Sequence, residues 1–213
     1  MAIKPILFNT EMVRAILDGR KTCTRRLVNP RQFMGMLLDG CKNATPDEFL
    51  KNKRMMFKPY CDMTDAELIM TAYKEPYQPG DILYVRETFY EDVDCILYKA
   101  DNEKLTGYRN MRGEDIVVKW RPSIQMPKEA ARIWLKVTDV RVERLQEITI
   151  DGIRNEGISS MAVHAGDKEI ALKEWENLWN STIKKSDLDR YGWDANPYVF
   201  VIEFERCEKP EGV

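Results

Sequence analysis

The stretch between residues 132 and 142 limits the possible folds more than any other part of the sequence. Apolar and polar residues alternate along it, as in a strand with one buried face. The apolar positions are Ile133, Leu135, Val137, Val140 and Val142. Their phase moves by one residue at Asp139, which is the effect of a β-bulge, and bulges bend a strand and increase its twist. The stretch therefore predicts a bent strand in a curved sheet.

Further patterns predict a mixture of strands and helices. Strands are expected at 3–8, 82–85, 95–98, 116–120 and 198–204. Helices are expected from Asn9 or Thr10 to Gly19, over 149–157 and over 167–182. Pro5 favours a sheet edge for the first strand, and the absence of a regular strand–helix–strand rhythm excludes a doubly wound sheet. The expected fold class is α+β, a small barrel or curled sheet with peripheral helices.

Length and composition indicate a single globular domain in the cytoplasm. A chain of 213 residues is long enough to bury a substantial core without disulfides or a structural metal. It has no apolar run long enough to span a membrane, and its N-terminal residues do not form a signal segment. We therefore expect a cytoplasmic protein that does not engage a membrane.

The cysteines and the single histidine argue against a metal centre. Five cysteines without a Cys-x-x-Cys pair are typical of reduced cytosolic thiols. His164 alone cannot build a histidine-rich site, and it argues against a Ser-His-Asp triad. A zinc site from Cys41, Cys61 and Cys95 is the alternative, but its spacings match no usual ligand pattern. The sequence predicts neither a metal nor a cofactor.

Positive charge is concentrated in two segments of a chain whose net charge is −2. Residues 14–26 hold five cations and one aspartate, and residues 119–136 hold five cations and one glutamate, so each segment carries +4. Two such segments on an otherwise acidic chain indicate a confined anion-binding surface. The alternative is that both are ordinary solvated basic stretches.

The segment from Gly19 to Arg26 contains the first candidate for chemistry. Among four cations the ammonium form of Lys21 is disfavoured, which predicts a lowered pKa. A neutral Lys21 could then accept the proton of the Thr24 hydroxyl and make it a nucleophile. Residues three apart on a flat strand face opposite sides, so the two groups meet only if the chain turns after Gly19. The alternative is a plain phosphate- or carboxylate-binding cluster.

Two further sites complete the candidates. Glu156 lies in the last turn of the helix expected at 149–157, where the helix dipole disfavours a carboxylate and suits it to acid–base work. The alternative is a solvated surface glutamate. The stiff loop 120–127 combines Trp120, Arg121 and Ser123, which suit stacking on and hydrogen bonding to a nucleobase or single strand. The alternative is a packed loop with Trp120 in the core.

Together these pieces resemble the ASCH family, relatives of the PUA-like RNA-binding domains, and more closely an ASCH-like group common in bacteriophages and prophages. The matching segments are 4–8, 17–22 with Thr24 and Arg26, 78–83, 85–88, 120–127, 155–157 and 198–204. The segments 31–76, 99–115 and 159–192 fall outside the match and are interpreted as insertions in a single domain. The resemblance implies a β-barrel with peripheral helices and a cleft for RNA or nucleotides in a bacterial, phage- or prophage-encoded protein.

The resemblance also implies an activity and a set of residues. One small bacterial enzyme of the family hydrolyses the amide of N4-acetylcytidine with a lysine, a threonine and a glutamate. Its Gly-Arg-Lys-Thr-x-Thr motif matches here, which places the catalytic lysine at Lys21 and the threonine at Thr24, and its glutamate falls in the helix end that matches Glu156. The residues expected to bind RNA or a modified nucleoside are Arg20, Arg25, Arg26, Arg86, Trp120, Arg121 and Ser123.

This sequence also departs from that enzyme. Arg25 replaces an apolar residue, and the regions 31–76 and 91–131 are additional, so the substrate can differ or the site can be closed. The alternatives are a non-catalytic module for single-stranded RNA, an ASCH-type ribonuclease, and a phage protein that engages a host partner through the methionine-rich segment 31–76.

Overall fold

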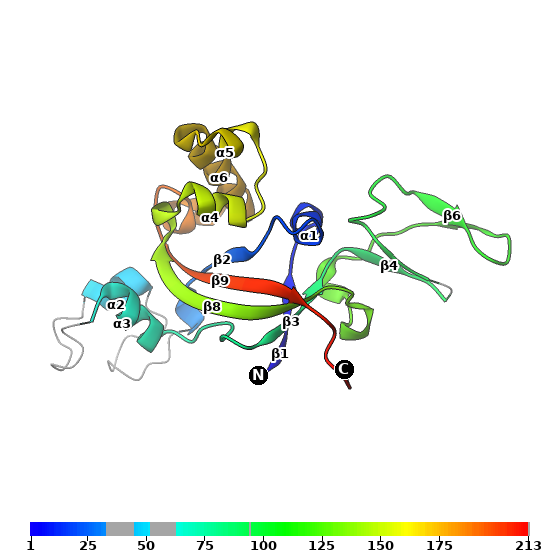
Figure 1. Cartoon of the computed structure of the whole chain (residues 1–213), viewed down its shortest axis with the longest axis horizontal. Helices are drawn as coiled ribbons and strands as arrows, with labels where there is room; N and C mark the ends of the chain where they lie inside the picture. Colours follow the sequence, from blue (N-terminus) through cyan, green and yellow to red (C-terminus); the bar gives the residue numbers. More distant parts are fainter. Residues whose placement is uncertain (33–44, 52–62, 94, 213) are drawn as a thin grey trace.

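A curved five-stranded sheet forms the centre of the molecule (Figure 1). The computed structural model describes residues 1–32, 45–51, 63–93 and 95–212. The strands lie in the order β1 (Ile3–Leu7), β3 (Ile82–Arg86), β8 (Trp134–Arg144), β9 (Tyr198–Cys207) and β2 (Cys23–Leu27). β1 and β3 are parallel, and the other neighbours are antiparallel. The α+β class is therefore confirmed, and β1 with Pro5 is an edge strand as expected.

The predicted bulge is present in β8. Val137 lies opposite Phe204 and Asp139 lies opposite Glu203, so Thr138 is the additional residue between consecutive pairs. Beyond it the alternation resumes with Val140 opposite Ile202. The bulge thus keeps the apolar side chains on one face while the strand bends, and Figure 1 shows β8 and β9 curving together.

β9 is buried on both faces because it separates two apolar cores. Phe200 and Ile202 belong to the core that also contains Ile6 and Val13. Val199 and Val201 face the other way, into a core built on Trp175 and Trp179 of α6 (Lys168–Thr182). This explains why the last strand is apolar at consecutive positions before its later glutamates.

The three predicted helices, α1, α4 and α6, begin and end close to the predicted residues, and α2, α3, α5 and α7 were not predicted. Their bounds are α1 Thr10–Leu17, α2 Pro46–Lys51, α3 Asp65–Ala72, α4 Ile150–Asn155, α5 Met161–Ala165, α6 Lys168–Thr182 and α7 Leu188–Tyr191. Asn9 caps α1 by accepting a hydrogen bond from the backbone N–H of Met12, and Gly19 follows its end with a φ of 73°. Thr149 and Asp167 cap α4 and α6 in the same way. Figure 1 places α4, α5 and α6 together on one side of the sheet.

Two small hairpins form an arm that extends from the sheet (Figure 1). The first joins β4 (Phe89–Glu91) to β5 (Ile96–Tyr98), and the second joins β6 (Gly107–Arg109) to β7 (Asp115–Val117). At the base of the arm the buried carboxylate of Glu87 accepts two hydrogen bonds from Arg132, which also pairs with Asp101. These contacts of Arg132 link the arm to the segment that leads into β8.

Strand pairing does not close the sheet into the expected barrel. In the described part of the chain β1 and β2 are the two edge strands and pair with one neighbour each. α1 connects them, and its apolar side chains Val13 and Ile16 fill the core between the sheet edges. A side-chain hydrogen bond from Arg26 Nη2 to the carbonyl oxygen of Leu7 links β2 to β1 across the remaining space. The interpretation of 1–213 as one domain with three insertions stays a prediction.

Among the described residues, no helix is long and apolar enough to cross a membrane.

Candidate functional site

A turn after α1 brings Lys21 to the end of α4. The backbone N–H groups of Arg20 and Lys21 both donate to the carbonyl oxygen of Ala15, at 2.8 and 3.0 Å. The chain therefore reverses after Gly19, which is the turn that the hypothesis of a meeting between Lys21 and Thr24 needs. Lys21 then forms an isolated antiparallel bridge with Glu156, and the N–H of Thr22 donates to the carbonyl oxygen of Asn155 at 2.8 Å.

Lys21 and Glu156 form a buried ion pair. Lys21 Nζ lies 2.7 Å from Glu156 Oε2 and also donates to the Glu156 carbonyl oxygen at 3.0 Å. Their side chains are 0% and 2% exposed. The ammonium also lies 5.5 Å from the ring centroid of Phe8, within reach of a cation–π interaction. Two residues 135 positions apart thus meet at one place, as the catalytic hypothesis requires.

Arg25 gives Glu156 a second cationic partner. Its Nη1 lies 3.2 Å from Glu156 Oε1, and its Nη2 lies 3.1 Å from Glu143 Oε2 on β8. The side chain is 3% exposed, and its Cζ lies 5.9 Å from the Trp175 ring centroid. Gly152 leaves the space that this guanidinium needs, because a Cβ there would lie 3.2 Å from Arg25 Nη2. Arg25, which departs from the motif of the enzyme that the sequence resembles, is therefore part of the same ion-pair group.

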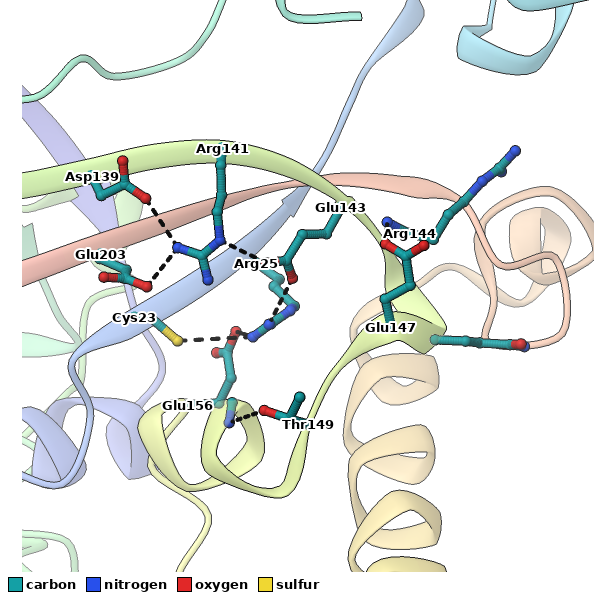
Figure 2. Close-up of polar contacts among 12 residues, drawn as sticks. Cys23, Arg25, Asp139, Arg141, Glu143, Arg144, Glu147, Thr149, Glu156 and Glu203 are labelled. Atoms are coloured by element: carbon teal, nitrogen blue, oxygen red, sulfur yellow. Dashed lines mark hydrogen bonds and ion pairs between the residues drawn. The ribbon is translucent and has the colours of Figure 1, made fainter. Parts of the chain in front are cut away.

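The ion-pair group continues along β8 (Figure 2). Glu143 also accepts from Arg141, and Arg141 pairs in turn with Asp139 and with Glu203 of β9. The connected residues are Lys21, Arg25, Arg141, Asp139, Glu143, Glu156 and Glu203. With three cations and four carboxylates this ion-pair group carries a formal charge of −1, which corrects the expectation of a cationic field around Lys21.

Thr24 lies on the opposite face of β2 from Arg25. It pairs with Ile202, whose side chain belongs to the core beneath α1, whereas Arg25 pairs with Val201 on the other face. Thr24 is 3% exposed. The hydrogen bonds found in the described part of the chain include none from its hydroxyl. The structure thus brings Lys21 and Glu156 together and buries Thr24 near the start of β2.

Besides Arg25, which pairs with Glu143 and Glu156, three further predicted ligand-binding arginines are engaged by the protein itself. Arg20 pairs with Asp18 and donates to the carbonyl oxygen of Gly157. Arg26 lies 5.5 Å from the Phe8 ring centroid, and burial lowers its pKa. Arg86 donates to the carbonyl oxygen of Met126 at 2.8 Å and to that of Ile124, so it supports the loop 120–127 from below.

The remaining predicted ligand residues lie on the arm. Arg121 is 51% exposed, 3.5 Å from a carboxylate oxygen of Glu91. Trp120 and Ser123 are half-buried. The loop is anchored in the core by Met126, which is 1% exposed, so Met126 and not Trp120 occupies the buried position. Among the described residues, no hydrogen bond or ion pair joins this loop to Lys21 or Glu156.

A cavity of about 120 Å³ adjoins the buried pair. Glu156, Gly157 and Ile158 line one side of it, and Asn9, Met12 and Ala15 of the α1 region line another. The Glu156 end of the ion pair is therefore the part that a small group could reach without unfolding the site.

Sequence analysis missed the β8 half of the ion-pair group. Asp139, Arg141 and Glu143 occur at alternate positions of a strand that was itself predicted, so they had to share one face. That spacing was the available signal. The spacing could not predict which residues of other strands these side chains contact, because Glu203 and Arg25 come from distant parts of the chain.

Cys23, beside Arg25, is expected to resist alkylation in the folded protein. Burial raises the pKa of its thiol to about 12, and the nearby Glu156 carboxylate acts in the same direction. The thiolate is the reactive form, so at pH 8 only about 10⁻⁴ of the Cys23 side chains are ionised, against about a quarter for a free cysteine. Labelling with iodoacetamide, followed by peptide mass spectrometry, should be at least ~10³ times slower than in the unfolded chain. Equal rates would contradict the burial of this thiol.

No three His, Cys, Asp or Glu side chains of the described residues are grouped so that they could hold a metal ion. Of the cysteines in the alternative zinc site, Cys41 and Cys61 lie outside the described residues.

Comparison with known proteins gives one structural similarity. No family model matches the chain, and no curated protein matches it. A solved structure described as the ASCH domain from Lactobacillus crispatus JV V101 is similar, with 11% sequence identity and a TM-score of 0.36. The match covers 96% of this chain and 79% of that one. At this TM-score the similarity assigns neither the fold nor the function of the chain.

Proposed function

We propose that this chain binds a modified nucleoside or single-stranded RNA and hydrolyses the amide of an N4-acylated cytidine. In this proposal Thr24 is the nucleophile, Lys21 is its base and Glu156 holds and relays the proton. The observation that carries the proposal is the 2.7 Å contact between Lys21 Nζ and Glu156 Oε2, formed by the residues that the family resemblance assigns to catalysis. Glu156 also lines a cavity of about 120 Å³ beside α1.

The proposed reaction proceeds in two steps. Thr24 Oγ1 attacks the acyl carbon and gives its proton to Lys21 as the Lys21 ammonium passes one of its own protons to the Glu156 carboxylate. The bond from the acyl carbon to N4 breaks, N4 takes a proton from the pair, and cytidine leaves with Thr24 acylated. A water molecule then loses a proton to the pair and attacks the ester. The carboxylic acid leaves and Thr24 regains its proton.

A second candidate function is binding without catalysis. It is favoured by the burial of the three catalytic candidates, each 3% exposed or less, while Arg121 presents its guanidinium to solvent. Such a module would bind single-stranded RNA with an affinity that falls as salt concentration rises. Replacing Arg121 would weaken this binding, and replacing Thr24 would not.

Incubation with N4-acetylcytidine, with product separation by liquid chromatography, distinguishes the two functions. We expect turnover by the wild-type chain, a loss of at least ~10³-fold in Thr24→Ala, and retained activity in Thr24→Ser. Thr71→Ala, which removes an exposed threonine of α3, is the matched control. Absence of turnover at high enzyme concentration, together with salt-dependent RNA binding, would support the second function and overturn the first.

The proposals of a ribonuclease activity and of a host partner engaged through 31–76 remain predictions. Within that segment residues 33–44 and 52–62 lie outside the described residues.

A further inference from the structure

We infer that a cationic pocket on the outer side of the Lys21–Glu156 bridge binds the phosphate group of a nucleotide or an RNA strand. The pocket has a volume of about 260 Å³ and lies where the turn after α1 meets the end of α4 and the start of α5. Its polar lining residues are Arg20, Thr22, Arg154, Asn155, Ser159 and His164.

The charged side chains that line the pocket are cations. Arg20 and Arg154 retain 38% and 49% exposure, although each pairs with an aspartate on its own segment. Those aspartates, Asp18 and Asp151, do not line the pocket. A guanidinium has five N–H donors and suits bidentate binding of phosphate, so both arginines keep donors for a ligand after the aspartates and backbone carbonyls are satisfied.

The uncharged lining residues add short polar side chains at the same place. Thr22 and Asn155 are exposed and are joined by a backbone hydrogen bond of 2.8 Å, which fixes their separation. Ser159 is also exposed. His164 Nδ1 lies 2.7 Å from the carbonyl oxygen of Ser160, so that nitrogen is the donor and Nε2 remains free. Hydroxyl and amide donors beside two arginines are a suitable set for phosphate oxygens.

The position of the pocket indicates which substrate class it serves. Lys21 and Glu156 are buried, whereas their chain neighbours Thr22 and Asn155 are exposed. The ion pair therefore lies on the buried side of the backbone bridge, and the pocket lies on its exposed side. Ile158 lines both this pocket and the smaller cavity beside Glu156. If the proposed function is correct, a phosphate held here belongs to the same nucleotide as the acylated base, and the substrate is a nucleotide unit, not a free nucleoside.

The test compares the binding of cytidine, cytidine 5′-monophosphate and the dinucleoside phosphate CpC by isothermal titration calorimetry. We expect the two phosphate-bearing ligands to bind at least about tenfold more tightly than cytidine. Preference for the monophosphate would identify a free nucleotide as the ligand, and preference for the dinucleoside phosphate would identify an RNA strand. Equal affinity for all three ligands, or no measurable binding of either phosphate, would overturn the inference.

Matched variants locate the binding. Ser159→Asp replaces the hydroxyl donor by a negative charge and should lower phosphate affinity at least about tenfold, whereas Ser159→Asn keeps an uncharged donor and should lower it much less. Arg154→Ala should weaken binding by a similar factor, and Arg109→Ala, which removes an aspartate-paired arginine from the arm, should not. Equal affinities in Ser159→Asp and Ser159→Asn would contradict the location.

The binding of phosphate ligands can be tested independently of whether the protein hydrolyses N4-acetylcytidine. If phosphate ligands bind but N4-acetylcytidine compounds are not hydrolysed, the pocket stands and the proposed hydrolase does not. If the free nucleoside is hydrolysed as fast as its phosphates, the hydrolase stands and the pocket does not.

Discussion

Replacing Glu156 by glutamine is expected to lower the free energy of unfolding by about 3–5 kcal/mol. The carboxylate accepts from Lys21 at 2.7 Å and from Arg25 at 3.2 Å, and all three side chains are at most 3% exposed. Glutamine keeps the shape but leaves two cations buried beside a neutral group. The cost of desolvating unpaired charge is much larger than the gain from a surface ion pair. Urea unfolding at neutral pH, followed by circular dichroism, measures the difference.

Asp151→Asn is the matched control for this prediction. Asp151 lies in the same helix and pairs with Arg154, but its side chain is 80% exposed. Exposed pairs contribute about 0–1 kcal/mol, so this variant should unfold close to the wild type. The double variant Lys21→Met with Glu156→Gln should recover part of the lost stability, because it removes one of the unpaired cations. Similar losses in Asp151→Asn and Glu156→Gln would show that Glu156 is not the buried partner described here.

Replacing Gly157 by alanine is expected to cost about 3 kcal/mol. Gly157 has a φ of 93°, in the region that side chains disfavour, and an added Cβ would lie 2.7 Å from Ala15 Cβ and 3.0 Å from Lys21 Cβ. None of these contacts is the flexible end of a side chain, so α1 and the end of α4 must separate. Because that separation acts on the bridge between Lys21 and Glu156, the variant should also lose any activity that depends on the pair. Thermal and urea unfolding measure the loss.

Gly166→Ala isolates the backbone contribution. Gly166 has a φ of 76° but no atom within 4 Å of the position of an added Cβ. Only the conformational cost remains there, about 1 kcal/mol. The difference between the two variants therefore reports the close packing of Gly157 on Ala15 and Lys21. If both variants lost the same amount, that close packing would be contradicted.

These stability predictions bear on how activity measurements are interpreted. A loss of activity in Glu156→Gln would be expected from unfolding alone, so it cannot by itself identify a catalytic residue. Thr24 has no such ion pair, and the Thr24→Ser variant keeps its hydroxyl. The role of the buried site is therefore best tested at Thr24, with Glu156 variants used below their unfolding transition.

The segment 31–76 contains one helix whose start could have been predicted from the sequence. In the segment 31–76, where weak periodicity suggested no clear element, α3 carries a capping box between Thr64 and Glu67. The spacing of a threonine three residues before a glutamate is a recognised start signal. The start of α3 could therefore be predicted from this spacing, but the scattered apolar residues of the segment obscured its helical periodicity.

The sequence by itself determined the local features of this protein: the bulge in β8, the caps of α1, α4 and α6, and the strand buried on both faces. Each follows from residues within one turn or a few strand positions, where side-chain period and backbone preference act directly. Only the tertiary structure decided which charges meet. Arg25 and Glu143 are 118 positions apart, and Lys21 and Glu156 are 135 apart. Such pairs depend on how the sheet bends and how α4 packs on β2, and no local pattern encodes the partner of a buried charge.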